Sequence, residues 1–255
     1  MIITDTHTHL YSTQFDEDRH KMMQRALDNG VTRFFIPAID SSYTEAMLDL
    51  EKEFSKYVFL MMGLHPTSVK ENYQDELNLV KEWLDKRKFY AVGEIGIDLY
   101  WDKSFLQQQQ DAFKKQIIWA KEKKLPIVIH CRDAFDEIFE VLDDVKDDKL
   151  YGIFHCFTGN LAQAKRAIDF NMKLGIGGVV TFKNGGIDKF LNEIALENIV
   201  LETDSPYLAP TPYRGKRNES SYIINVLHKL VDIYNLTAQE IAEITTQNSK
   251  KVFGI

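Results

Sequence analysis

The sequence has few cysteines and no long apolar run. Its two cysteines, Cys131 and Cys156, cannot provide a disulfide framework for a chain of 255 residues. No stretch of roughly 18 apolar residues occurs, and the first residues lack the basic and then apolar pattern of a secretory signal. We therefore expect a cytoplasmic globular protein without a membrane segment, and we infer no protein partner.

Basic residues are scarce relative to acidic ones. The chain has 31 Lys and Arg against 38 Asp and Glu, a formal net charge of -7. Because a long DNA-binding groove needs clustered Lys and Arg to neutralise phosphates, this balance argues against sequence-independent binding along DNA. It still allows a DNA end or a small phosphodiester to bind in a local pocket, where a cation would offset acidic ligands.

Prolines are also few, and half of the six lie in one segment. Pro206, Pro210 and Pro212 occur in "SPYLAPTPYRGKRNE". Such a segment can be neither helix nor central strand. It predicts a long rigid loop, and long ordered loops in compact domains are often functional.

The rest of the chain alternates between short β-branched or aromatic runs and amphipathic segments. The runs predict strands at residues 2–6, 33–36, 58–62, 90–93, 126–129, 152–154, 173–176 and 199–201. The segments between them predict helices at 16–29, 42–55, 74–88, 104–123, 133–145, 161–170 and, shorter, 187–194. Two more helices are expected after the eighth strand, at 219–234 and 237–246.

Eight strand-then-helix repeats predict the fold class α/β, with one domain over residues 1–255. The pattern favours a (β/α)8 TIM-type barrel, in distorted form, with extra C-terminal helices. A doubly wound open sheet is the competing architecture. No Gly-x-Gly-x-x-Gly motif follows the first strand, which weakens the dinucleotide-binding version of that alternative.

Histidine and carboxylate side chains recur where the predicted strands end. His7 and His9 are two residues apart, so on a strand both would point the same way. In a barrel the carboxyl ends of the strands form one ring, and active sites of this fold lie there. The six candidates at that ring are His7, His9, Glu94, His130, His155 and Asp204.

Imidazole and carboxylate groups together suit divalent metal ions. Six ligands are too many for one tetrahedral ion with an open position, but they suffice for two ions that share a carboxylate. We expect two divalent ions per chain, with Mg, Mn, Zn and Ni as candidates. Taken singly, each histidine could instead be a hydrogen-bonded core residue, and each acid could cap a turn.

The motifs "DTHTHL", "GLHP", "GEIGID", "HCRD", "HCF" and "ETDSPYL" occur in an order that resembles the TatD-like metal-dependent hydrolases, a branch of the amidohydrolase-type barrels. The resemblance runs from end to end. It implies one metal on His7, His9, Glu94 and Asp204 and a second on Glu94, His130 and His155, with Glu94 bridging. It also implies deoxyribonuclease activity, including trimming of DNA from 3′ ends.

Further residues near the predicted strand ends have two interpretations each. His65 either contacts a substrate phosphate or supports the rim, whereas for Arg132 phosphate binding is favoured over a salt bridge with Asp133 or Asp136. Tyr100 and Trp101, placed with Asp98 in the loop after the fourth strand, could stack a base or simply pack. Strand alternation is expected to turn both cysteines away from the pocket, as small buried apolar residues.

The resulting hypothesis is a phosphodiester hydrolase acting at DNA ends. Asp204 and Glu94 are the expected catalytic carboxylates, with Asp204 positioning the attacking water or accepting its proton. The alternative enzyme is a hydrolase of an ester or amide, such as an aminoacyl-tRNA deacylase. A metal-binding protein without enzymatic activity is the third possibility.

Overall fold

The computed structural model describes residues 1–255 and contains eight parallel strands that alternate with helices. The strands are β1 (Ile3–Asp5), β2 (Val31–Ile36), β3 (Val58–Leu60), β4 (Val92–Asp98), β5 (Ile127–Arg132), β6 (Gly152–Phe154), β7 (Met172–Ile176) and β8 (Ile199–Leu201). Neighbours pair in the order β1-β2-β3 and β4-β5-β6-β7-β8. The strand order therefore follows the chain order throughout.

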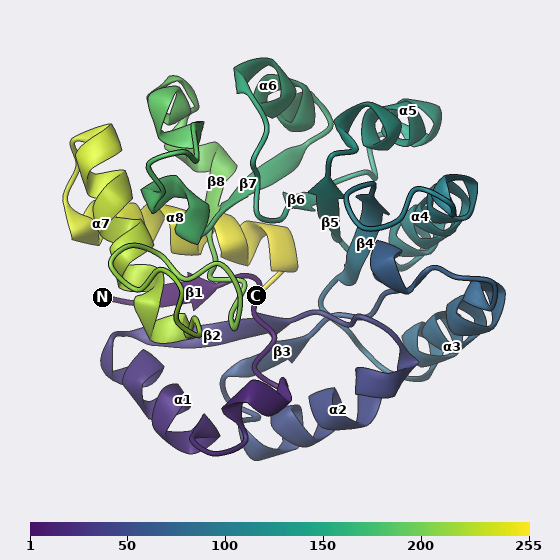
Figure 1. Ribbon diagram of the computed structural model, residues 1–255, viewed down its shortest axis with the longest axis horizontal. Helices are drawn as coiled ribbons and strands as arrows, with labels where there is room; N and C mark the ends of the chain where they lie inside the picture. The colour runs from purple at the N-terminus through teal and green to yellow at the C-terminus, as the bar shows by residue number, and fades with distance from the viewer.

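Short stretches of backbone contact on two sides join these two groups of strands into a ring. A parallel bridge links Met62, just after β3, to Val92 at the start of β4. On the other side the backbone N–H of Thr6, just after β1, donates to the carbonyl of Leu201 in β8 at 3.0 Å. The fold is thus the predicted (β/α)8 barrel, and it is distorted because both junctions are short. Figure 1 looks onto this ring, with helices following one another around its outside.

Eight of the nine predicted helices are present, with small differences at their ends and a longer last helix. They are α1 (Arg19–Asp28), α2 (Thr44–Glu53), α3 (Tyr73–Lys86), α4 (Leu106–Lys123), α5 (Phe135–Val145), α6 (Leu161–Asp169), α7 (Ile223–Tyr234) and α8 (Ala238–Phe253). The last begins with a capping box in which Thr237 and Glu240 satisfy each other's backbone N–H groups. It is longer than predicted, since it runs on to Phe253.

The short helix predicted at 187–194 is wrong. The segment forms two separate 3-10 turns, Ile187–Lys189 and Leu191–Glu193, with a non-helical backbone at Phe190. The hydroxyl of Tyr234 in α7 donates to the carbonyls of Leu191 and Ile194 at 2.7 and 2.9 Å. A helix ending at Ile194 would leave both carbonyls without an internal partner, and Tyr234 supplies one. The helical pattern itself breaks at Phe190, where φ is -129°.

Helix α8 lies across the ring and closes its amino end (Figure 1). Its Phe253 stacks on Phe35 of β2, with ring centroids 3.6 Å apart, inside a cluster of eight buried residues from the barrel interior. A much larger core of 59 buried residues includes the apolar faces between strands and outer helices. Side chains of α8 and the strands therefore fill the amino end of the barrel interior, whereas the carboxyl ends of the strands remain open.

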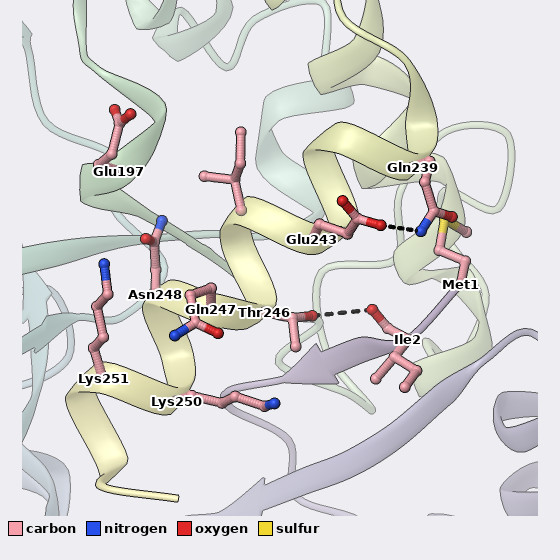
Figure 2. A pocket seen from close by; sticks show the side chains of 11 residues that line it. Met1, Ile2, Glu197, Gln239, Glu243, Thr246, Gln247, Asn248, Lys250 and Lys251 are labelled. Atoms are coloured by element: carbon pink, nitrogen blue, oxygen red, sulfur yellow. Dashed lines mark hydrogen bonds between the residues drawn. The ribbon is translucent and has the colours of Figure 1, made fainter.

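A hollow of about 700 Å³ lies beside α8 at the closed end. Figure 2 shows it between α8 and the first residues of the chain, where Thr246 donates to the carbonyl of Ile2. This hollow and the polar cluster described below lie at opposite ends of the strands, because Ile2 precedes β1 whereas the cluster lies at the carboxyl ends. None of the helices combines the length and the apolar character needed to cross a membrane.

Candidate metal centre

The six side chains expected at the strand ends lie together at the open end of the barrel. His7 and His9 follow β1, His155 follows β6 and Asp204 follows β8, whereas Glu94 and His130 lie within β4 and β5. All except His7 line one pocket of about 680 Å³, and His7 is completely buried next to it. Residues up to 197 positions apart in the sequence thus share one site, as the barrel geometry requires.

Glu94 lies at the centre of the cluster, and its two carboxylate oxygens face different histidines. Oε2 lies 3.0 Å from Nε2 of His7 and 3.7 Å from Nε2 of His9. Oε1 lies 2.8 Å from Nδ1 of His130 and 3.5 Å from Nε2 of His155. Each oxygen of the carboxylate is therefore directed at its own pair of imidazoles.

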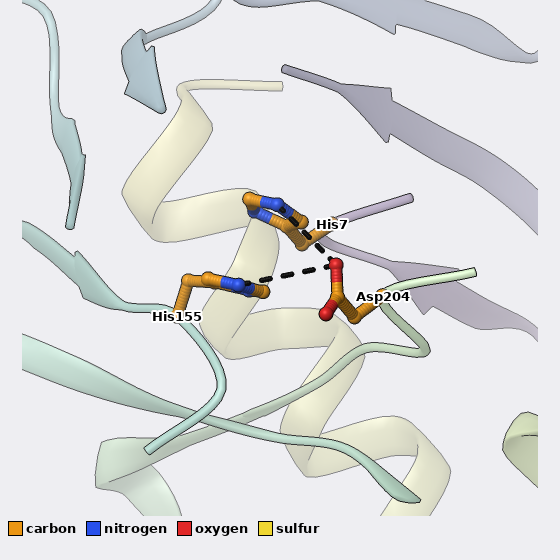
Figure 3. Close-up of side chains that lie close together, drawn as sticks. All are labelled: His7, His155 and Asp204. Atoms are coloured by element: carbon orange, nitrogen blue, oxygen red, sulfur yellow. Dashed lines mark ion pairs between the residues drawn. The ribbon is translucent and has the colours of Figure 1, made fainter. Parts of the chain in front are cut away.

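Asp204 faces three of these four histidines. Its Oδ1 lies 3.4 Å from Nε2 of His9, 3.9 Å from Nε2 of His7 and 4.0 Å from Nε2 of His155. Figure 3 shows the rings of His7 and His155 lying over one another, with this oxygen directed at both. Asp204 has a left-handed backbone with φ of 57°, and its N–H donates to the carbonyl of His7 at 2.9 Å. This bond ties the end of β8 to the end of β1.

A glycine lets the strands that carry Glu94 and His130 approach closely. A Cβ at Gly96 would lie 2.0 Å from the carbonyl oxygen of His130, and Gly96 has a φ of +145°, which side chains disfavour. The second glycine of "GEIGID" is thus required by the contact between β4 and β5.

Two buried carboxylates beside the histidines were not among the predicted site residues. The sequence placed Asp98 in a loop, which is wrong: it is the last residue of β4, and its Oδ2 lies 2.8 Å from Nε2 of His130. Glu202 is completely buried, and its Oε1 lies 3.0 Å from Nδ1 of His155. It also accepts the N–H of Cys156. The available signal was the spacing of Glu202 and Asp204, two residues apart in "ETD".

The buried carboxylates and histidines shift one another's pKa values, and the carboxylates favour positive charge in the cluster. Burial lowers the pKa of His155, but Glu202, Glu94 and Asp204 outweigh it and raise that pKa to about 10. Burial alone would raise the pKa of Glu94, yet the surrounding histidines hold it well below its usual range. Burial lowers the pKa of His7, and that of His65 as well, which keeps both rings neutral and able to donate a lone pair.

These features fit bound divalent cations. Groups of three ligand atoms within 4.8 Å of one another occur at His7, His9 and Glu94, at His7, His155 and Asp204, and at His65, Glu94 and His130. Nδ1 of His7 is buried without a hydrogen-bond partner. Nitrogen and carboxylate donors that converge on one pocket are the ligand set that such ions take in proteins. The site can therefore hold metal.

His65 and Arg132 both lie at this pocket, and the salt bridge considered for Arg132 is absent. Nε2 of His65 lies 3.3 Å from Oε1 of Glu94 and 3.2 Å from Nδ1 of His130. Arg132 has no carboxylate oxygen within 4.0 Å, so neither Asp133 nor Asp136 neutralises it. Its guanidinium instead packs over the ring of Tyr100 at 3.7 Å.

The expectation that both cysteines turn away from the pocket is wrong. Cys131 and Cys156 are half-buried and line it. At Cys156 the backbone has a φ of 43°, which ends the alternation of a strand. Burial raises the pKa of the Cys131 thiol to about 12 and that of Cys156 well above its usual value, so neither is a thiolate nucleophile near neutral pH.

Comparisons with known proteins agree with this geometry. A family model described as "TatD related DNase" matches residues 4–254. The chain is 36% identical over 255 residues to the "uncharacterized metal-dependent hydrolase YabD" of Bacillus subtilis, covering 100% of both. It is 30% identical to the "3'-5' ssDNA/RNA exonuclease TatD" of Pantoea ananatis, covering 98% and 99%. The crystal structure of YjjV, a TatD homologue of Escherichia coli, superimposes with a TM-score of 0.93 at 28% identity, covering 99% and 98% of the two chains.

Proposed function

Because this chain belongs to the TatD-related DNases, a family of metal-dependent hydrolases, we propose that it hydrolyses phosphodiester bonds at DNA ends. The observation that carries the proposal is the position of Glu94, whose two oxygens face two different groups of histidines. A single carboxylate shared in this way is what a two-ion phosphodiesterase site needs. The Pantoea relative is itself named as an exonuclease, which gives the reaction a precedent in the family.

In this proposal His7, His9 and Asp204 would hold one divalent ion and His130 and His155 the other, and Glu94 would contribute to both. When bound, such ions supply positive charge for the phosphoryl oxygens and make a water nucleophilic near neutral pH. Mg, Mn, Zn and Ni are the candidates, because the ligands combine nitrogen and oxygen donors.

Side chains of the protein itself orient the attacking water, accept its proton and bind the phosphate oxygens. Asp204 orients the attacking water and accepts its proton, since its carboxylate faces the histidines from the pocket side. Arg132 and His65 bind non-bridging oxygens of the phosphate, for which Arg132 is suited by its free guanidinium edge. No serine, threonine or thiolate is needed as a nucleophile, because water is the attacking group.

The test is an assay of the metal-loaded protein on two classes of substrate. We expect it to release nucleotides from a 3′-labelled single-stranded DNA when Mg²⁺ or Mn²⁺ is added, and EDTA to stop this release. A p-nitrophenyl ester and an aminoacyl-tRNA serve as substrates for the alternative, an ester hydrolase. Ester turnover without any release of nucleotides would overturn the proposal.

Variants of the two central carboxylates link that activity to the site. Glu94→Gln and Asp204→Asn keep side-chain size but remove charge, so we expect release of nucleotides to fall more than 1000-fold, on the order of losing a charged catalytic group. Glu122→Gln, a change on α4 outside the pocket, is the matched control. Circular dichroism checks that all variants keep the fold; activity within tenfold of wild type in both site variants would contradict the assignment.

A further inference from the structure

The most exposed large apolar side chain of the protein lies at the pocket. Only four aromatic side chains are exposed, namely Tyr43, Tyr100, Trp101 and Tyr207. All four come after the carboxyl end of a strand, at the open end of the barrel. Trp101 is 70% exposed and yet lines the same pocket as Glu94 and His130. Exposed aromatic rings concentrated beside a site indicate a binding surface.

The guanidinium of Arg132 packs against two of these rings and has no carboxylate partner. Its guanidinium carbon lies 3.7 Å from the ring centre of Tyr100 and 5.4 Å from that of Trp101. The two aromatic rings are perpendicular, with centroids 4.9 Å apart. A guanidinium stacked on an aromatic face keeps its N–H edge free for a phosphate.

The same carboxylate that contacts the metal-centre histidine also fixes this aromatic loop. Oδ1 of Asp98 accepts the backbone N–H groups of Tyr100 and Trp101 at 3.0 and 3.1 Å. Its other oxygen, Oδ2, lies 2.8 Å from Nε2 of His130. The position of the aromatic rings is therefore tied to the position of the reacting centre by a single buried side chain.

We propose that Trp101, together with Arg132 stacked on Tyr100, forms a nucleotide subsite for an unpaired strand end. Trp101 stacks on the base of the nucleotide next to the scissile phosphate, while Arg132 binds that phosphate. An unpaired base is required because both faces of a base inside a duplex are covered by its neighbours. Stacking on an aromatic side chain accepts any base, so the subsite selects single strands without selecting sequence. This inference rests on the proposed phosphodiesterase function and adds the residues that hold the terminal nucleotide.

Trp101→Ala tests the subsite with two matched substrates. We expect the KM for a single-stranded oligothymidylate to rise about tenfold, with kcat nearly unchanged, since the ring contributes binding rather than chemistry. On the same oligonucleotide with an abasic residue in place of the stacked base, wild type and variant should have the same KM. Trp101→Phe keeps a ring and should retain most of the affinity, and Ile118→Ala, an exposed apolar residue of α4 outside the pocket, should change nothing.

Binding without turnover provides the second measurement. Titrating the metal-free protein with oligothymidylate should quench tryptophan fluorescence, and this quenching should disappear in Trp101→Phe while Trp83 and Trp119 remain. If wild type degrades DNA but Trp101→Ala has an unchanged KM and Trp101→Phe retains the quenching, the subsite is wrong and the proposed function stands. If wild type degrades no DNA at all, the proposed function fails, and loss of quenching in Trp101→Phe still decides whether the rings bind bases.

Discussion

Asp98 and Glu94 contact His130 from opposite edges of its ring. Oδ2 of Asp98 lies 2.8 Å from Nε2, and Oε1 of Glu94 lies 2.8 Å from Nδ1. Burial lowers the pKa of His130, but the two carboxylates outweigh it, and the net shift is upward. The ring is thus fixed in orientation by two charged partners, which is the arrangement that orients a histidine ligand in metal sites.

We predict that Asp98→Asn weakens metal binding without unfolding the protein. The amide cannot replace the charged acceptor beside Nε2, so His130 loses its fixed orientation, and losses of this kind lower metal affinity about 10- to 100-fold. Isothermal titration with Mn²⁺ measures the affinity.

The matched control is Asp102→Asn in the same loop. Asp102 pairs with Lys70 and caps Ser104, and it does not contact His130. Its substitution should leave the Mn²⁺ affinity within about twofold. Equal affinities for wild type and Asp98→Asn would show that Asp98 does not position the ligand.

We predict that Gly175→Ala displaces the buried Glu202. A Cβ at Gly175 would lie 2.2 Å from Oε2 of Glu202 and 3.2 Å from Cα of His155, so that the carboxylate must move. Such overpacking costs about 3 kcal/mol in the free energy of unfolding, measured by urea denaturation. Mn²⁺ affinity should fall as well, because His155 loses its partner.

Gly177→Ala is the control on the same segment. The nearest atom to its Cβ would be Cγ of Glu202 at 3.5 Å, which is an ordinary contact. Its free energy of unfolding should stay within about 1 kcal/mol of wild type. If both alanine variants were equally stable, the contact with Glu202 would not be the reason for the glycine at 175.

The barrel and the cluster of predicted ligands could be inferred from sequence because both follow from local patterns. Alternating strands and helices predict parallel strands in chain order, and this order brings residues such as Glu94 and Asp204 to the same end. The roles of Asp98 and Glu202 could not be read in this way. Asp98 reaches His130 because β4 pairs with β5 so that Asp98 lies opposite Arg132. The register between two strands is a tertiary property that neither strand encodes alone.

The wrong predictions have similar causes. Residues 187–194 carry a helical pattern, but the backbone leaves the helical range at Phe190 and only two 3-10 turns form. The prediction for Cys156 extends the alternation of β6 past its last residue, Phe154, to a position where the backbone is left-handed. Both are cases in which a local rule holds only while the regular element continues.

We predict that divalent ions stabilise the protein and that Glu94→Gln removes this effect. An ion at 100 times its dissociation constant raises the free energy of unfolding by about 2.7 kcal/mol. For a chain of this size that is a rise in Tm of about 5–10 °C. Differential scanning fluorimetry with EDTA and then with excess Mn²⁺ measures it.

The same titration on Glu122→Gln should give the full rise in Tm, since that side chain lies outside the pocket. In Glu94→Gln the rise should be close to zero, because the amide is a poor shared ligand. A full rise in Glu94→Gln would place the ions elsewhere.

The loop after β8 is attached to α1 by an ion pair whose strength should depend on pH. Arg217 donates to both carboxylate oxygens of Asp18 at 2.7 and 2.9 Å, and Arg25 donates to Oδ2 of the same group at 3.0 Å. The hydrogen bond from Arg217, aided by Arg25, lowers the pKa of Asp18 to about 2 despite partial burial, from 3.8 for the free side chain. The stabilisation is therefore fully present above about pH 4 and lost as the pH falls toward 2.

We predict that Asp18→Asn costs about 1 kcal/mol in the free energy of unfolding at pH 6, the shift being discounted because the carboxylate is 26% exposed. The cost should shrink as the pH approaches 3, because the Asp18 carboxyl of the unfolded chain, with a pKa of 3.8, takes up a proton before that of the folded chain. Urea denaturation of both proteins between pH 3 and 7 measures this. In an Arg217→Gln background the same change should cost less at every pH, because the main partner is gone. A cost that stayed constant down to pH 3 would mean that Asp18 acts through packing rather than through its charge.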